Sequence, residues 1–126
     1  MLRETAALGS TVREFRGFDT FPKPDGVTDV VMASSEVTAV CPVTGQPDQY
    51  RVKIAYWPID QCLESKSLKL YLQSFRNEGV FCEALAARIA NDTGRALSCA
   101  VEVVIEQTPR GGVGIEATAI ADHRAR

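Results

Sequence analysis

The chain has 126 residues, a formal net charge of -2, four cysteines and one histidine. A chain of this length forms one domain and buries roughly two thirds of the surface that it exposes when unfolded. The slightly acidic balance argues against a general nucleic-acid-binding surface. No apolar run approaches the ~20 residues that span a bilayer, and the N-terminus lacks a signal-peptide pattern. We therefore expect a cytoplasmic protein without a nucleic acid or a membrane as partner.

The small size also bears on ligand binding. A domain of this length has little room for a large pocket of its own, and such chains often build their sites between subunits. A homo-oligomer is therefore expected. Four irregularly spaced cysteines in a cytoplasmic chain are expected to be thiols. Without CxxC spacing, and with His123 as the sole histidine, the sequence predicts no Cys/His metal site.

Both ends of the chain are expected to lie outside the core domain, which covers residues 28–121. Residues 1–27 mix charge, Gly and Pro, and predict an N-terminal arm, with a regular helix or strand as the open alternative. Three aromatic residues are spaced to pack this arm onto the body: Phe15, Phe18 and Phe21. Residues 122–126 form a polar tail.

Two long strands are expected first. Residues 28–40 are rich in Val and Thr and predict a strand that bends or bulges at Ser34-Ser35-Glu36. Residues 50–57 alternate with a period of two, which is typical of a half-buried strand.

Helical periodicity follows. One apolar repeat predicts a helix over about 67–77, with Ser65 or Ser67 as its cap. A second repeat, which begins at Phe81, predicts another helix that ends near residues 92–94.

Two further strands complete the domain. Residues 99–107 and 114–120 return to strand composition on either side of a turn at 108–112. The resulting order, ββααββ, predicts an antiparallel four-stranded sheet with both helices on one face. The expected fold class is α+β.

The segment Cys41-Pro42-Val43-Thr44-Gly45-Gln46-Pro47-Asp48 has the composition of a reactive site. Its prolines and glycine interrupt the strands, so that a cysteine at one strand end and an aspartate at the next strand start can face one cleft. Cys41 is a candidate nucleophile whose pKa the turn N–H groups can lower; the alternative is a small buried hydrophobic residue. Asp48 is a candidate proton donor, with an Asx-turn residue as the alternative.

Charged residues supply three further candidates. Lys66 and Lys69 share a face at a helix N-terminus and can bind a phosphate, although a solvated helix face is the alternative. Arg110, in a hairpin turn, can add a bidentate phosphate contact or simply be exposed. Glu83 can accept paired N–H bonds from a guanine-like edge, or it can be an acidic residue that favours the helix N-terminus.

Four segments together resemble the QueF family of NADPH-dependent 7-cyano-7-deazaguanine reductases, enzymes of the queuosine pathway in the tunnelling-fold superfamily. They are Cys41 to Asp48, Glu64-Ser65-Lys66-Ser67-Leu68-Lys69-Leu70-Tyr71, Ser74-Phe75-Arg76-Asn77 and Thr108-Pro109-Arg110-Gly111-Gly112. The resemblance runs from about Glu36 to Gly112, and two long motifs in the right order make coincidence improbable.

The resemblance implies a four-electron reduction of a nitrile to a primary amine with NADPH as the cofactor. Cys41 would attack the nitrile carbon to form a thioimide, and Asp48 would supply a proton. A second set of residues would bind the deazaguanine substrate: Glu64, Ser65, Cys82 and Glu83. A third set would hold the NADPH phosphate: Lys66, Lys69 and Arg110.

The resemblance also implies a ring-like oligomer of the short, single-module type with sites between subunits. One departure from the family pattern is Cys82-Glu83, where the family usually has His-Glu. His123 is not expected to replace that histidine unless a neighbouring subunit supplies it. If Cys82 occupies the place of the histidine, Cys41 and Cys82 can form a reversible disulfide.

Three other functions are alternatives to the reductase. A tunnelling-fold amidinotransferase would add ammonia to the thioimide, but such relatives lack the signature over residues 64–71. A pterin-forming cyclohydrolase would need metal-ligand histidines. A non-reducing homologue would keep the 7-deazaguanine pocket and the adduct but not the turnover.

Overall fold

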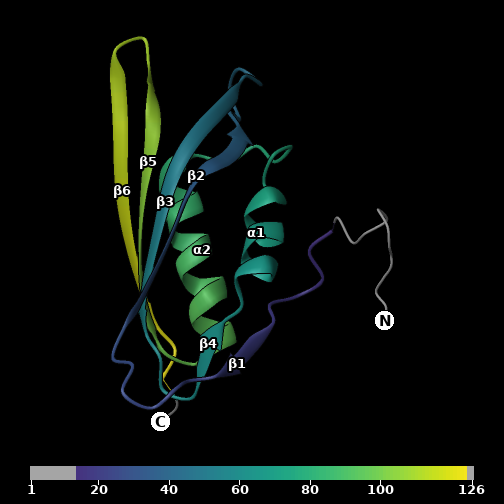
Figure 1. Cartoon of the computed structure of the whole chain (residues 1–126). Coiled ribbons are helices and arrows are strands. Elements are labelled where there is room, and N and C mark those ends of the chain that lie inside the picture. The colour runs from purple at the N-terminus through teal and green to yellow at the C-terminus, as the bar shows by residue number, and fades with distance from the viewer. Residues whose placement is uncertain (1–13, 125–126) are drawn as a thin grey trace.

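A four-stranded antiparallel sheet, in the order β2-β3-β5-β6, carries both helices on one face (Figure 1). The computed structural model describes residues 14–124. Its elements are β1 (Thr20–Pro22), β2 (Val30–Val40), β3 (Pro47–Trp57), β4 (Gln61–Leu63), α1 (Ser65–Gln73), α2 (Cys82–Leu97), β5 (Ala100–Arg110) and β6 (Val113–Asp122). The four long strands and two helices follow the predicted ββααββ order, so the α+β class is confirmed.

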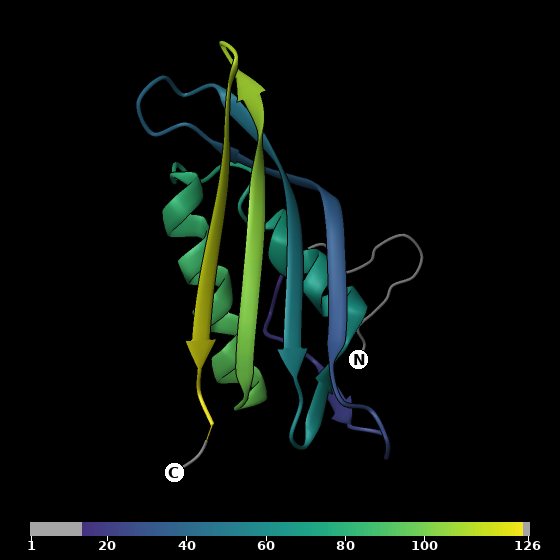
Figure 2. The same ribbon diagram turned by 90° about the vertical axis from the view of Figure 1, so that its left-hand side faces the viewer.

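The core lies between the sheet and the helices. Period-two alternation directs four side chains of β3 toward the helices, and each is at most 2% exposed: Tyr50, Val52, Ile54 and Tyr56. α2 packs mainly on β5 and β6. Figure 2 shows that neither α1 nor α2 covers the opposite face of the sheet, where Val31, Trp57 and Ile120 are exposed. Neither helix within residues 14–124 is long and apolar enough to cross a membrane.

The predicted irregularity in the first long strand is confirmed. The pairing of β2 with β3 shifts register between Ser34 and Val37. The hydroxyl of Ser34 accepts a hydrogen bond from the Glu36 backbone N–H at 3.2 Å, which is a local contact that competes with ladder pairing.

A second, two-stranded sheet was not among the predicted elements. β1 pairs with β4, with Thr20 opposite Leu63. Strands of three residues are too short to show a period, and Pro22 is tolerated because β1 is an edge strand. The rings of Phe15 and Phe18 lie 5.1 and 4.7 Å from that of Tyr71 on α1. Residues 1–13 of the predicted arm lie outside the described residues.

The predicted serine cap of α1 is wrong. The Glu64 carboxylate occupies the N-cap and accepts hydrogen bonds from the backbone N–H groups of Lys66 and Ser67, both at 2.8 Å. The Ser67 hydroxyl instead accepts a hydrogen bond from Asp19 N–H at 2.9 Å, which ties the chain before β1 to the helix. α1 also ends at Gln73, before the predicted residue 77.

The predicted stop of α2 near residues 92–94 is also wrong, because the helix continues to Leu97. The Thr93 hydroxyl donates to the carbonyl of Ile89 at 2.7 Å, so it does not end the helix. Gly94 is needed for packing, since a Cβ there would lie 2.8 Å from Cδ2 of His123. The helix thus passes the local stop signal and ends at Leu97, where Ser98 adopts a left-handed conformation as the C-cap.

Candidate active site

The turn after β2 exposes the Cys41 thiol to hydrogen-bond donors. Gly45 N–H donates to the carbonyl of Cys41 at 2.9 Å, and Cys41 N–H donates to that of Gln46 at 2.8 Å. Gly45 has a φ of 74°, which a residue with a side chain rarely adopts. Hydrogen bonds from the side chain and backbone of Thr44, and from the backbone of Val43, lower the pKa of Cys41. The lowered pKa favours the nucleophilic thiolate.

Backbone pairing brings the start of α2 to the end of β2. Val40 N–H donates to the Glu78 carbonyl at 2.9 Å, and Val80 N–H donates to the Val40 carbonyl at 3.1 Å. The segment before α2 thus lies alongside the last residue of β2 as a short parallel bridge. This pairing brings Cys41 and Cys82 to one cavity, although they are 41 residues apart in the sequence.

Asp48 is buried and paired with Arg110. The Asp48 residue is 6% exposed, and its Oδ1 accepts a hydrogen bond from Arg110 Nη1 at 3.0 Å. The same guanidinium donates to the carbonyl of Pro47 at 2.6 Å and to the side-chain oxygen of Gln46. Arg110, predicted to hold a cofactor phosphate, contacts the candidate proton donor in this chain.

Five predicted site residues line one cavity of about 500 Å³: Cys41, Asp48, Cys82, Glu83 and Arg110. The wall also contains apolar groups, among them Phe81, which is 55% exposed. Thr44 and Gln46 line the cavity as well, and neither was singled out, although both belong to the segment that indicated the site. The sequence-based expectation that Cys41 and Asp48 face a common cleft is confirmed.

Cys82 differs from Cys41 in its surroundings. Its side chain is 1% exposed, and burial together with the nearby carboxylates of Glu83 and Asp48 raises its pKa to about 11. Cys82 is therefore a thiol at neutral pH. Both cysteines are free in the structure. Their reversible disulfide stays a prediction, which thiol titration after mild oxidation and again after reduction would test.

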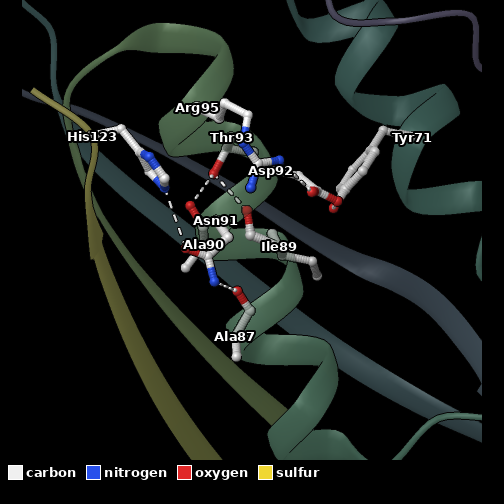
Figure 3. Close-up of polar contacts among 9 residues, drawn as sticks. All are labelled: Tyr71, Ala87, Ile89, Ala90, Asn91, Asp92, Thr93, Arg95 and His123. Atoms are coloured by element: carbon white, nitrogen blue, oxygen red, sulfur yellow. Dashed lines mark hydrogen bonds and ion pairs between the residues drawn. The ribbon is translucent and has the colours of Figure 1, made fainter. Parts of the chain in front are cut away.

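The sole histidine lies at the other end of α2. Its Nε2 is 3.2 Å from Oδ1 of Asn91 (Figure 3). Its ring also lies beside Gly94, where an added Cβ would come within 2.8 Å of His123 Cδ2. Cys82 begins the helix, whereas Asn91 and Gly94 lie in its second half. His123 of the same chain therefore does not reach the cavity that holds Cys41.

The remaining predicted residues lie on and before α1, away from the cysteine cavity. Ser65 and Lys69 line a second cavity of about 440 Å³ between α1 and β2, which shares no lining residue with the first. Lys66 is exposed, and Glu64 caps the helix. The backbone donors expected to attract phosphate are thus bound to the Glu64 carboxylate. No cluster of three or more metal-ligating side chains occurs within residues 14–124.

The fold and the site together define an α+β domain with an activated thiol and two carboxylates around one partly apolar cavity, an arrangement suited to nucleophilic chemistry. The family model described as QueF-like protein matches residues 47–126. The chain belongs to this family.

Curated relatives support the same assignment over most of the chain. A protein of Anaeromyxobacter sp. (strain Fw109-5) named NADPH-dependent 7-cyano-7-deazaguanine reductase is 47% identical over 107 residues, which cover 82% of this chain and 88% of that protein. A protein of the same name from Syntrophus aciditrophicus (strain SB) is 44% identical over 119 residues, covering 90% of this chain and 84% of the relative.

A solved structure has a similar fold. The apo form of an archaeosine synthase described as QueF-Like matches with a TM-score of 0.72, covering 77% of this chain and 96% of that one. At 22% sequence identity, the likeness concerns the fold alone.

Proposed function

We propose that this protein reduces the nitrile of 7-cyano-7-deazaguanine to the primary amine of 7-aminomethyl-7-deazaguanine, with NADPH, in the cytoplasm as part of queuosine biosynthesis. Relatives that are 47% and 44% identical over 107 and 119 residues bear the name of that reductase. The observation that carries the proposal is the convergence of Cys41, Asp48 and Glu83 on one cavity.

Cys41 is the nucleophile of the proposed reaction. Its thiolate attacks the nitrile carbon, a C–S bond forms, and one π bond of the nitrile breaks to give a thioimide. The nitrogen takes up one proton. Asp48, a buried carboxylate that lines the same cavity, takes this proton from the Cys41 thiol as the thiolate forms and passes it to the nitrogen. When bound, NADPH supplies the hydrides, two of which are needed to reach the amine. Cys41 leaves as a thiolate before the amine is complete, so it is regenerated.

Glu83 orients the substrate. A carboxylate at the first turn of α2 can accept two N–H bonds from the amino and ring N–H groups of a 7-deazaguanine. The ring would then lie between Glu83 and Cys41, with Phe81 at the cavity wall. Cys82, as a neutral buried thiol, fills the space beside it.

Lys66 and Lys69 are the proposed phosphate ligands for NADPH. Both are exposed, and Lys69 together with Ser65 lines the second cavity. The two ammonium groups are compatible in charge with a phosphate, while the capping carboxylate of Glu64 orients the first turn. The double variant Lys66→Ala/Lys69→Ala should weaken NADPH binding and leave the Cys41 adduct intact. Loss of the adduct would mean that the lysines serve the fold or the nitrile site.

A ring-like homo-oligomer of tunnelling-fold subunits is part of the same proposal. β2 and β6 are the two edges of the sheet, and their outer backbone groups are available for pairing with a neighbour. The face without helices exposes Val31 and Ile120, on β2 and β6 respectively. A neighbouring subunit could also bring the Lys69 cavity of one chain to the Cys41 cavity of another. Light scattering that gives 13.7 kDa, the mass of one chain, would contradict it.

The deciding experiment measures NADPH oxidation by the purified protein with 7-cyano-7-deazaguanine, and identifies the product by mass. Consumption of about two NADPH per amine formed is expected. A stable mass increase on Cys41 without oxidation of NADPH would overturn the reductase. That result would favour the amidinotransferase or the non-reducing homologue. Added ammonia would distinguish them, because only the amidinotransferase would convert the adduct.

A further inference from the structure

Tyr50 does not itself line the Cys41 cavity, but it lies beside residues that do, and it carries a buried hydroxyl without a hydrogen-bond partner in the described part of the chain. The residue is 1% exposed. Its Oη is the one buried side-chain oxygen or nitrogen within residues 14–124 that lacks a partner. A phenylalanine would fill the same space without an unpaired polar group, so the retained oxygen calls for an explanation.

The hydroxyl lies among residues that line the Cys41 cavity. Tyr50 is two residues after Asp48 on β3, so both side chains leave the same face of the sheet. It is also the register partner of Gln107, which lines the cavity. Burial first, and then the charges of four lining residues, raise the pKa of Tyr50 to about 12; these residues are Asp48, Cys82, Cys41 and Glu83. The phenol therefore keeps its proton at neutral pH and can donate it in a hydrogen bond.

The chemistry of the substrate gives this donor a partner, and this step rests on the proposed function. Along one edge of 7-cyano-7-deazaguanine stand, in order, the nitrile, the ring carbonyl, the ring N–H and the amino group. If Cys41 bonds the nitrile carbon and Glu83 accepts from the two N–H groups, the carbonyl oxygen falls between them. A carbonyl placed there loses its water and needs a donor.

We propose that the Tyr50 hydroxyl donates a hydrogen bond to the ring carbonyl of the bound 7-deazaguanine, and that this contact selects a ring with a carbonyl over one without. No covalent bond changes in this step. The hydroxyl is covered in the ligand-free chain, so the contact requires a side-chain rotation of Tyr50 or Cys82 that opens the base of the cavity.

Two matched variants separate this role from a structural one. Tyr50→Phe removes only the oxygen, and Tyr56→Phe makes the same change on the same face of β3, where the hydroxyl accepts a bond from Leu63 N–H at 2.9 Å. In a Cys41→Ala background, which keeps binding noncovalent, calorimetric titration with 7-cyano-7-deazaguanine should show about tenfold weaker binding for Tyr50→Phe. Thermal unfolding of that variant should be unchanged or shifted upward. Tyr56→Phe should show the reverse pattern, with lower stability and unchanged affinity.

A second ligand tests the pair through a comparison between two proteins. 2-Amino-7-cyano-7-deazapurine lacks the carbonyl and also the ring N–H that Glu83 would accept from, so it should bind the Tyr50 protein much more weakly than the natural ring. The loss at Glu83 is the same in both proteins and cancels when their penalties are compared. In Tyr50→Phe that penalty should shrink by about tenfold, because one partner of the contact is already absent.

The outcomes of this experiment discriminate between the two proposals. Unchanged affinity and an unchanged penalty in Tyr50→Phe would overturn the role of Tyr50 and leave the nitrile reductase in place. If the unsubstituted protein neither binds the nitrile nor forms an adduct, the proposed function fails, and the role of Tyr50 fails with it.

Discussion

The two ends of α2 differ in how their polar groups are satisfied. In its second half, Tyr71 donates to Asp92 at 2.7 Å, Arg95 pairs with Asp92 at 3.5 Å, and His123 meets Asn91 (Figure 3). At its start, Cys82 and Glu83 face a cavity, and the Tyr50 hydroxyl near them has no partner within residues 14–124. Groups that bond to one another hold a structure together, whereas groups left open toward a cavity are available to a ligand.

This difference also decides which titratable side chains are candidates for chemistry. The hydrogen bond to Asp92 and burial keep the hydroxyl of Tyr71 protonated, because both raise its pKa. At the open end, hydrogen bonds to the thiolate lower the pKa of Cys41. The same helix therefore joins a structural region to a reactive one.

The largest expected effect comes from removing the nucleophile Cys41 from the cavity at the start of α2. Cys41→Ala should abolish the adduct and reduce turnover by more than about a thousandfold, because no other thiol of lowered pKa lines the cavity in the described residues. Intact-protein mass and NADPH oxidation measure the two effects. Cys62→Ala removes a buried thiol outside this cavity and should keep the adduct. Surviving turnover in Cys41→Ala would rule out covalent catalysis.

The next effect concerns the ion pair that holds Asp48. Arg110→Ala leaves a buried carboxylate without its partner and should reduce turnover about a hundredfold. Because the Arg110 side chain is 41% exposed, unfolding free energy should fall by only about 1–2 kcal/mol. Arg110→Lys keeps the charge but not the planar contacts. Its turnover should fall between that of the unsubstituted protein and that of Arg110→Ala. Equal activity of all three proteins would show that Arg110 does not position Asp48.

A smaller effect tests the cause of thiol activation. Thr44→Val removes the hydroxyl that contributes most to the lowered pKa of Cys41, so the pH midpoint of its alkylation should rise toward that of an unstructured cysteine. The midpoint rises in the variant because the Thr44 hydroxyl stabilises the thiolate, so the thiolate forms at a lower pH when Thr44 is present. Cys82, with a pKa of about 11, should stay unreacted throughout. An unmoved midpoint would assign the activation to the backbone N–H groups alone.

The smallest effect on activity is expected in the second half of α2, where polar groups are paired with one another. Gly94→Ala places a Cβ 2.8 Å from the His123 ring and should lower stability by about 1 kcal/mol without changing turnover of the folded protein. In a His123→Ala background the clash is absent, so the same substitution should stabilise by about 0.5–1 kcal/mol through helix propensity. Chemical denaturation measures both. A change in turnover would contradict the separation of the two ends.

Strong local patterns account for the parts of the fold that were predicted. Alternation over residues 50–57 placed β3, and apolar repeats placed both helices. Short elements and helix ends were missed where distant contacts decide. β1 and β4 pair with each other although they are distant in the sequence, and α2 continues through Gly94 to Leu97, where Ser98 is the C-cap.

The residues of the candidate site could be predicted from the sequence, but the sets in which they lie together could not. The resemblance groups Arg110 with Lys66 and Lys69, yet Arg110 lines a different cavity from Lys69 and bonds to Asp48. The register of β3 with β5, which brings Tyr50 opposite Gln107, determines that contact. Tyr50 itself looked like one more core residue of an alternating strand, and only its unpaired hydroxyl distinguishes it.

The class of fold, the family motifs and the chemical types of the reactive side chains follow from the amino-acid sequence, because periodicity and residue identity are local properties. Other features become visible only in three dimensions: Cys41, Cys82 and Arg110 share one cavity, Glu64 is a helix cap, and His123 lies beside the second half of α2. These arrangements depend on strand register and on packing between segments distant in sequence, which no local pattern specifies.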